Sequence, residues 1–258
     1  MIFYYRTEGF VFKKEDRLEA DRVFSVFTKD FGRIEVFGKA IRKINAKLRS
    51  GIEIFSLSEI EFIQGKNKKT LIYALLLEKF KNIENVPEKL EIAYKISDVL
   101  DSLIKGEEKD ENIFNLLNDS LSKLNNYSPL IADYLLIYYY FFWNFISILG
   151  HKPEIFKCVA CQQKLNPESL YFSNKEGGVI CKVCFSSKKD GVKTNSDLVK
   201  VLRLILKKVP RSGNGTGIPV AEGDLGNWDI LPRLKIENKT KLLLKEISES
   251  YHRYLLSI

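Results

Sequence analysis

The sequence predicts an α+β, multidomain protein in which a five-stranded β unit precedes an all-helical domain, itself interrupted by a cysteine-bearing module. Three observations predict this plan. Residues 1–80 alternate apolar and polar side chains between short turns, residues 81–150 follow a helical period, and the four cysteines form two C-x-x-C pairs. The expected segments are 1–80, 81–155, 156–187 and 188–258, with the second and fourth forming one helical domain.

Five strands are expected in the first segment, because stretches rich in β-branched and aromatic residues are separated by polar or glycine-containing turns. A polar connection is expected over residues 13–20, and Gly32 suits the positive φ of a turn at 29–32. Five such strands suit a small barrel or a sandwich, and an OB-type barrel has five strands and binds single-stranded nucleic acid. The expected strands are 3–13, 21–28, 33–41, 52–63 and 70–77.

The loop between the third and fourth strands, residues 38–51, is purely basic, because no acidic residue occurs between Glu35 and Glu53. Phosphate binding requires several cations along a backbone with little opposing charge, so the loop is a candidate nucleic-acid contact. The alternative is a solvated surface loop. The candidate contacts are Arg33, Lys39, Arg42, Lys43, Lys47 and Arg49, and the candidate base-stacking rings are Phe10, Phe31 and Phe37.

The net charge of +8 is unevenly distributed along the chain. Residues 1–80 contain 16 basic and 11 acidic side chains, residues 81–150 contain 6 and 11, and residues 151–258 contain 19 and 11. Two basic ends therefore flank an acidic middle. A basic field of this kind attracts polyanions. The alternative interpretation is a solvated, lysine-rich surface, and the total charge alone does not exclude it.

Helices are expected from residue 81 onward, since apolar residues recur there every three or four positions. A charged break at 106–110 separates the first two helices. A segment rich in glycine and proline, 211–238, precedes the last helix. Its alternating glycines neither follow a strand nor begin a helix, so they are only a weak indication of a phosphate-binding loop. The expected helices are 90–103, 113–124, 130–149, 194–210 and 240–256.

The helix expected at 130–149 begins with Ser128 as N-cap and Pro129 in its first turn. Its run of tyrosine, phenylalanine and tryptophan is apolar all round, which is typical of a buried helix. A membrane span is the alternative, but the apolar run is interrupted by Asn144 and is shorter than the ~20 residues that a bilayer requires. We therefore expect a central helix covered by its neighbours, and no membrane partner.

The four cysteines, Cys158, Cys161, Cys181 and Cys184, have the spacing of a structural zinc site. Two residues between thiols allow a tight turn to direct both sulfurs at one point, and two such turns make the tetrahedron of thiolates that suits Zn²⁺. Two disulfides would require an oxidising compartment, and a redox pair would require a βαβ unit that the sequence lacks. Four thiolates also leave no coordination position for a catalytic water. One structural Zn²⁺ per chain is the expectation.

The sequence carries no recognisable catalytic set. His151 and His252 are the only histidines, and neither neighbours a plausible nucleophile. No Ser-His-Asp set, Walker loop or paired-carboxylate pattern is present, so we expect the protein not to be an enzyme. The N-terminal residues lack the basic and apolar regions of a signal peptide, which indicates a cytoplasmic protein with reduced thiols.

Three stretches of the N-terminal segment carry a family resemblance. Residues 7–12 read T-E-G-F-V-F, residues 21–33 contain D-R-V-F followed by F-T-K-D-F-G-R, and residues 38–49 contain G-K-A-I-R-K and K-L-R. These stretches, the two cysteine pairs and the overall plan resemble the zinc-bearing members of the bacterial RecO family of DNA repair proteins. The family's basic loop reads K-G-A-R-R and S-R-L-R, whereas here Gly38 precedes Lys39 and Ala46 replaces the serine.

The resemblance implies an OB-fold, a helical domain and a zinc module. It also implies a recombination mediator, associated with the nucleoid, that binds single- and double-stranded DNA and anneals complementary strands without ATP. Its implied partners are RecR, often RecF, and single-strand binding protein, on whose DNA complex the mediator loads RecA. A protein-docking adaptor without direct DNA contact is the alternative function, with the zinc module as its docking surface.

Overall fold

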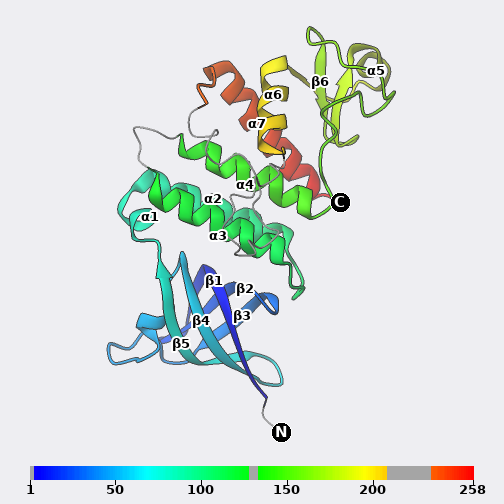
Figure 1. Ribbon diagram of the computed structural model, residues 1–258. Helices are drawn as coiled ribbons and strands as arrows, with labels where there is room; N and C mark the ends of the chain where they lie inside the picture. Colours follow the sequence, from blue (N-terminus) through cyan, green and yellow to red (C-terminus); the bar gives the residue numbers. More distant parts are fainter. Residues whose placement is uncertain (1–2, 128–132, 208–233) are drawn as a thin grey trace, which may run out of the picture. The chain divides into compact units, whose positions relative to one another are not determined.

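The computed structural model describes residues 3–127, 133–207 and 234–258, and the chain forms two compact units, Met1–Tyr127 and Ser128–Ile258. The first unit contains the β-barrel and the helices α1 to α3, and the second contains a small sheet and the helices α4 to α7 (Figure 1). The predicted α+β class, with an N-terminal five-stranded barrel followed by helices, is confirmed. The glycine- and proline-rich segment expected at 211–238 lies mostly outside the described residues.

The barrel closes in the order β1-β2-β3-β5-β4, with β4 returning to β1. All of its neighbouring strands are antiparallel except β3 and β5, which run parallel and share two residue pairs, Val36 with Lys69 and Phe37 with Thr70. Closure leaves few unpaired strand edges, so the barrel needs little covering. The strands are β1 (Tyr4–Arg17), β2 (Asp21–Thr28), β3 (Gly32–Gly38), β4 (Ser56–Gln64) and β5 (Lys69–Lys79).

The five expected strands are present, but the polar connection expected at 13–20 is wrong. Strand β1 continues to Arg17, since Lys13 pairs with Ser25 and Arg17 pairs with Asp21 of β2. Charged side chains are compatible with this long hairpin because they lie on its exposed surface. Gly32 has a φ of +65° in the next turn, as the sequence predicts.

The barrel core is a single cluster of buried apolar side chains that come from all five strands and from the long β3–β4 loop. Two loop residues belong to it, Ile41 and Ile52, so both ends of the basic segment are held in the core. The cluster contains Val11, Phe24, Val26, Ile34, Val36, Ile41, Ile52, Ile60, Phe62 and Leu71.

Three helices pack with the barrel in the first unit. The N-cap of α3 is Asp110, whose carboxylate accepts the backbone N–H of Asn112 and Ile113. Phe10 of β1 contacts Phe114 of α3, with ring centroids 4.9 Å apart, so α3 is joined to the barrel by apolar contact. The helices are α1 (Lys81–Asn85), α2 (Pro87–Leu103) and α3 (Glu111–Asn126).

The second unit is built on α4, whose aromatic residues are buried as predicted. Helix α4 (Tyr134–Ile148) has Asp133 as its N-cap, and the start expected at Ser128 and Pro129 lies outside the described residues. Trp143 is fully buried, donates its indole N–H to Ser248 at 3.0 Å and stacks on Tyr251. No helix within residues 3–127, 133–207 and 234–258 is long and apolar enough to span a membrane.

Two further helices and a three-stranded sheet complete this unit. Asn195 caps α6 (Ser196–Ile205) by accepting the N–H of Leu198, and α7 (Asn238–Leu255) supplies the Ser248 and Tyr251 that contact α4. The sheet has the order β7-β6-β8. Its strands, with the short helix that follows β7, are β6 (Leu170–Ser173), β7 (Gly178–Cys181), α5 (Lys182–Lys188) and β8 (Val192–Thr194).

Candidate nucleic-acid interface and metal centre

The basic loop, defined as residues 39–49, is a series of tight turns. The N–H of Lys43 donates to the carbonyl of Ala40 at 3.2 Å, the N–H of Ala46 to Lys43 at 3.1 Å, and the N–H of Arg49 to Ala46 at 3.2 Å. The series ends in a single 3₁₀ turn, η1 (Arg49–Gly51). The backbone of the loop is therefore held by its own hydrogen bonds. These bonds fix the Cα positions from which the basic side chains extend.

The loop is also tied to the barrel at both ends. The N–H of Arg42 donates to the carbonyl of Ala20 at 2.9 Å, and the N–H of Ala40 donates to the carboxylate of Asp21 at 2.7 Å. At the other end, Gly51 lies against β5 so closely that a Cβ there would be 2.0 Å from the carbonyl oxygen of Ala74. Only glycine permits this approach.

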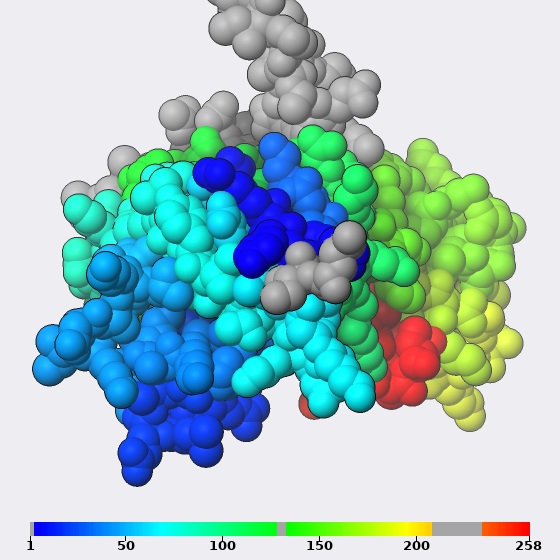
Figure 2. All heavy atoms as spheres, turned by 90° about the horizontal axis from the view of Figure 1, so that it is seen from below, coloured from blue at the N-terminus to red at the C-terminus, as the bar shows by residue number. Residues whose placement is uncertain are grey.

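The five cations of the basic loop are all exposed. Arg42 forms an ion pair at 3.4 Å with Asp16, and Asp16 also accepts a 2.7 Å hydrogen bond from Arg22 that lowers its pKa below the ordinary value. Among the described residues, Lys39, Lys43, Lys47 and Arg49 have no acidic partner. Figure 2 shows the segment around residues 40–50 projecting from the barrel surface at the left edge of the view. This arrangement leaves cations available for phosphate groups.

Arg33 differs from the five loop cations. Its guanidinium donates to the carboxylate of Asp101 in α2 at 2.6 Å, and only a fifth of its side chain is exposed. Lys13 binds the same carboxylate at 2.8 Å. Arg33 therefore joins β3 to α2, and its place among the DNA contacts stays a prediction.

The three candidate stacking rings have different environments. Phe10 is 1% exposed and packs on Phe80 and Phe114, so the prediction that it stacks on bases is wrong. Phe31 packs edge-on against Tyr5 and Phe62 and helps to close the barrel core. Phe37 lies on the outer face of β3, and within the described part of the chain it has no ring-to-ring contact.

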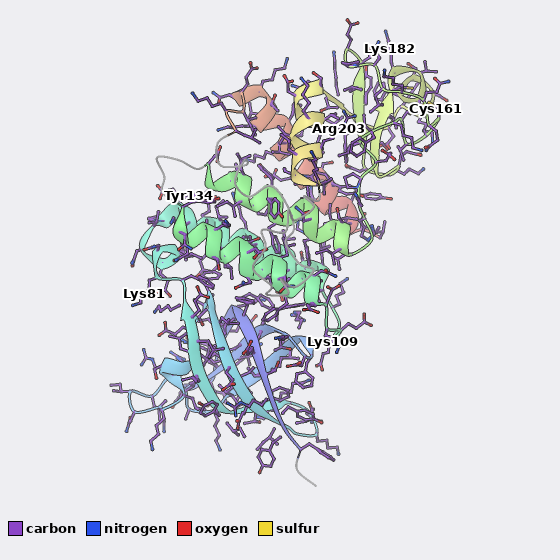
Figure 3. All side chains as sticks on the ribbon, in the orientation of Figure 1. Lys81, Lys109, Tyr134, Cys161, Lys182 and Arg203 are labelled. Atoms are coloured by element: carbon purple, nitrogen blue, oxygen red, sulfur yellow. The ribbon has the colours of Figure 1, made fainter. Side chains whose placement is uncertain are left out.

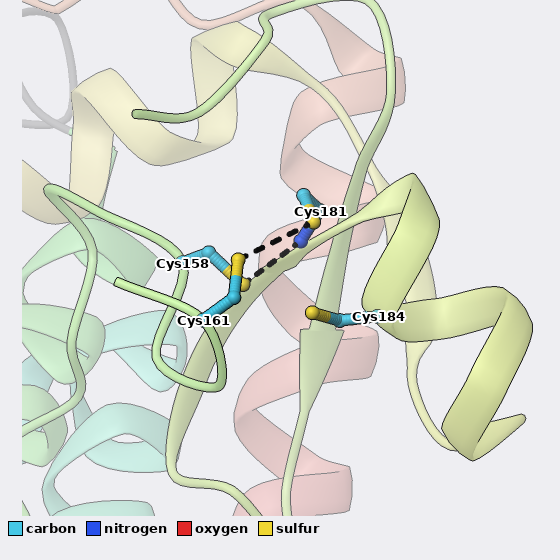
Figure 4. A group of neighbouring side chains, drawn as sticks. All are labelled: Cys158, Cys161, Cys181 and Cys184. Carbon is cyan, nitrogen blue, oxygen red and sulfur yellow. Dashed lines mark hydrogen bonds between the residues drawn. The ribbon is translucent and has the colours of Figure 1, made fainter. Parts of the chain in front are cut away.

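The four cysteine sulfurs meet at one point, although the cysteines come from two separate turns (Figure 4). Their Sγ atoms all lie within 4.8 Å of one another, and those of Cys161 and Cys181 are 3.9 Å apart. Tetrahedral Zn²⁺ with Zn–S bonds of about 2.3 Å requires sulfurs about 3.8 Å apart. Within the described part of the chain, this is the one group of metal-ligating side chains close enough to share an ion.

Local backbone geometry directs each sulfur inward. The N–H of Gln162 donates to the carbonyl of Cys158 at 2.8 Å and closes the first C-x-x-C turn. Cys181 ends β7 and is the N-cap of α5, and Cys184 follows in the first turn of that helix. The N–H of Cys181 also approaches the sulfur of Cys158 at 3.4 Å, which links the two turns.

The thiols differ in acidity. Burial raises the pKa of Cys158, but the backbone N–H groups of Cys161 and Cys181 donate to its sulfur and bring the pKa down to about 6. The pKa of Cys184 rises to about 12, chiefly through its hydrogen bond with Cys161. The hydrogen bonds thus favour the thiolate of Cys158, whereas a metal that binds all four sulfurs must displace the proton that the raised pKa keeps on Cys184.

The prediction from the sequence missed a second group of cations beside Phe37. The β4–β5 hairpin contains Lys66, Lys68 and Lys69, and the Nζ of Lys68 lies 3.7 Å from the centroid of the Phe37 ring. The signal was available, because residues 65–69 read G-K-N-K-K and contain no acid.

Comparisons with known proteins agree with these features. The family model described as "Recombination protein O N terminal" matches residues 1–80, and the model described as "Recombination protein O C terminal" matches residues 85–214. The chain is 32% identical over 201 residues to the DNA repair protein RecO of Dehalococcoides mccartyi, a match that covers 78% of each protein. It is 24% identical over 253 residues to that of Thermoanaerobacter sp., covering 98% of this chain and 93% of the relative. The chain therefore belongs to the RecO family.

Proposed function

We propose that this protein is a DNA repair and recombination mediator that binds single- and double-stranded DNA through its basic loop. The observation that carries the proposal is the exposure of Lys39, Arg42, Lys43, Lys47 and Arg49 on a hydrogen-bonded loop without an acidic residue of its own. The names of its relatives, DNA repair protein RecO, support the biological context.

The proposed activity is the annealing of complementary strands without ATP. Each loop cation that meets a phosphate releases a counterion and neutralises one backbone charge. Two complementary strands repel each other less once their backbones are neutralised, so their bases can pair. Arg42 can join such contacts readily, because an exposed ion pair such as that with Asp16 is weak and easily exchanged.

The proposed partners are those that membership of the RecO family implies. The mediator acts with RecR, and often with RecF, to load RecA on DNA that is coated by single-strand binding protein. The four cysteines hold one structural Zn²⁺, because their sulfur spacing fits a tetrahedron of thiolates and fills the coordination sphere. The metal then stabilises its module and supplies no reactive position.

An annealing assay tests the proposal. Two complementary labelled oligonucleotides, bare or coated with single-strand binding protein, are mixed without ATP, and duplex formation is followed by energy transfer. The parent protein should accelerate annealing, and replacing Arg42, Lys43 and Lys47 by Ala should remove most of that acceleration. A matched variant with Lys81, Lys95 and Lys123 of α1, α2 and α3 replaced by Ala loses the same charge and should anneal like the parent.

Two results would overturn the proposal. A parent protein that neither binds DNA nor accelerates annealing would favour a docking adaptor. Equal losses in the two triple variants would mean that total charge matters and the basic loop has no special role.

A further inference from the structure

The tip of the basic loop carries an exposed apolar side chain that the proposed phosphate contacts do not use. Ile44 is 94% exposed, the largest exposed fraction among the large apolar side chains in the described part of the chain. The loop has two other large apolar residues, and both contribute to the barrel, since Ile41 belongs to its core and Leu48 packs against that core. Of the three, only Ile44 is left to solvent.

The backbone holds Ile44 at the corner of a turn. The N–H of Ala46 donates to the carbonyl of Lys43 at 3.1 Å, which closes a turn with Ile44 and Asn45 at its two central positions. Both ends of the loop are anchored to the barrel by hydrogen bonds or by close backbone contact. The loop is therefore a firm support for a side chain that pushes into a ligand.

The neighbours of Ile44 along the loop are cationic or polar. Arg42 and Lys43 precede it, Asn45 and Lys47 follow it, and all four are exposed. One side chain is too little apolar surface for a protein or a membrane, because a standard protein interface buries about 800 Å² on each partner and a membrane-bound helix inserts a whole apolar face. The space between two neighbouring base pairs admits one apolar side chain, and the phosphates beside that space attract cations.

We propose that Ile44 is a wedge that inserts between two adjacent base pairs of duplex DNA, while Lys43 and Lys47 contact the phosphates on either side. The inference rests on the proposed DNA-binding function and adds to it a deformation of the bound duplex. Apolar wedges of this kind, isoleucine among them, partly unstack a base step and bend the duplex by about 20–90°. The cations bind any backbone, whereas the wedge acts only on stacked base pairs, so mutations can separate the two contributions.

The free energy needed to open a base step gives the wedge a measurable signature. Unstacking takes less free energy at a mismatch than at a matched pair. A protein that inserts a wedge therefore binds a mismatched duplex more tightly than a matched one. A protein that contacts only phosphates does not distinguish the two duplexes, because both present the same charges.

The turn between β1 and β2 provides a matched control for Ile44. Leu18 in this turn is 86% exposed, and it belongs to the same compact unit. Residues 15–21 contain four acidic side chains and one arginine, so they repel phosphate groups. Leu18 is thus an equally exposed apolar side chain without the cations that a DNA wedge requires.

Two labelled duplexes of equal length, one fully paired and one with a single central mismatch, test the proposal with the full, zinc-loaded chain. An aminopurine base next to the mismatch reports unstacking through its emission, and dyes at the two ends report bending through energy transfer. The parent should raise both signals and bind the mismatched duplex about threefold more tightly than the matched one. Ile44→Ala should lose both signals and bind the two duplexes equally. Its affinity for oligothymidylate should stay within twofold of the parent, because the phosphate contacts remain.

Further variants separate the wedge from charge. Ile44→Leu keeps an apolar side chain at the tip and should behave like the parent. Lys43→Ala should weaken binding of both duplexes equally and keep the preference for the mismatch, because the lost contact is with phosphate. Leu18→Ala should match the parent in every signal. So should Lys109→Ala, which removes a cation from the loop between α2 and α3 (Figure 3).

The proposal is overturned if the parent produces no unstacking, if Ile44→Ala keeps the parent's signals and mismatch preference, or if Leu18→Ala loses them as well. It is also overturned if Ile44→Ala loses binding to phosphatidylserine vesicles but keeps the signals on DNA, because the tip would then be a membrane anchor. The failure of the basic-loop proposal has a different signature: the variant with Arg42, Lys43 and Lys47 replaced by Ala would bind both duplexes and oligothymidylate like the parent.

Discussion

The barrel and the cysteine module are both small β structures, but different interactions hold them together. The barrel encloses ten buried apolar side chains. The module has three strands of four, four and three residues, and its buried apolar residues are few: Leu170, Phe172, Val179 and Ile180 among its strands. Units this small usually require a metal or disulfides, because they bury too little surface. The barrel core can therefore support a loop with five cations and no acidic residue, whereas we expect the module to depend on its four sulfurs.

The largest expected effect comes from breaking the metal site. Cys158→Ser removes a fully buried cysteine of the proposed metal site, whose sulfur also accepts the N–H of Cys181. Elemental analysis should find well under one zinc per chain, compared with about one for the parent, and the module should unfold locally because metal binding and folding are coupled. Hydrogen exchange should rise in residues 154–194 and stay unchanged in β1 to β5.

A control for that variant lies beside Cys184. Val183→Ser changes a side chain that is 78% exposed and has no ligand role, so zinc content and exchange should match the parent. Retention of one zinc and of the parent's melting temperature in Cys158→Ser would contradict the structural role of the metal.

The next effect concerns the close approach of the basic loop to β5. Gly51→Ala puts a Cβ 2.0 Å from the carbonyl oxygen of Ala74, and this backbone contact can be relieved only by moving the loop. We expect a loss of about 2–3 kcal/mol in the free energy of unfolding, as in other overpacked sites, measured by urea denaturation. Ser50→Ala, on the exposed side of the same turn, is the control. Equal unfolding midpoints for all three proteins would show that the loop is not held as described.

A smaller, pH-dependent effect is expected at Asp101. Burial raises the pKa of this carboxyl, but hydrogen bonds from Lys13 and Arg33 outweigh the burial and leave the pKa below its ordinary value. The ionised carboxylate therefore stabilises the fold above the ordinary aspartate range, near pH 4, and this contribution is lost as the pH falls through the lower pKa of the folded state. Asp101→Asn should cost about 1–2 kcal/mol at pH 7 and less at pH 3, which lies below the ordinary aspartate pKa.

The control for Asp101 is a neighbour on the same helix. Asp98→Asn changes an exposed carboxylate of α2, and its unfolding free energy should stay within about 0.5 kcal/mol of the parent at both pH values. If Asp101→Asn unfolds at the same urea concentration as the parent at pH 7, the charges around Asp101 do not join the barrel to α2.

The same contrast shows how far the sequence could predict this structure. The barrel strands follow from alternation over long stretches, and the cysteine site follows from spacing alone, because both signals are local. The bond between Arg33 and Asp101 joins residues 68 positions apart, so Arg33 could not be separated from the free cations by reading the sequence. Strand β8, three residues long, is too short to show alternation. The burial of Phe10 depends on where α3 packs, which the composition of β1 does not specify.

One measurement tests directly the central claim that the basic loop is a phosphate-binding surface. The affinity for single-stranded DNA is measured at several salt concentrations for the parent, for the variant with Arg42, Lys43 and Lys47 replaced by Ala, and for the control with Lys81, Lys95 and Lys123 replaced. Each lost phosphate contact should flatten the slope of log K against log salt by about 0.7, so the loop variant should be flatter by about 2 and bind more weakly at every salt concentration. The control should keep the parent's slope. A loop variant with the parent's slope and affinity would contradict the account, because the five cations would then be only a solvated surface.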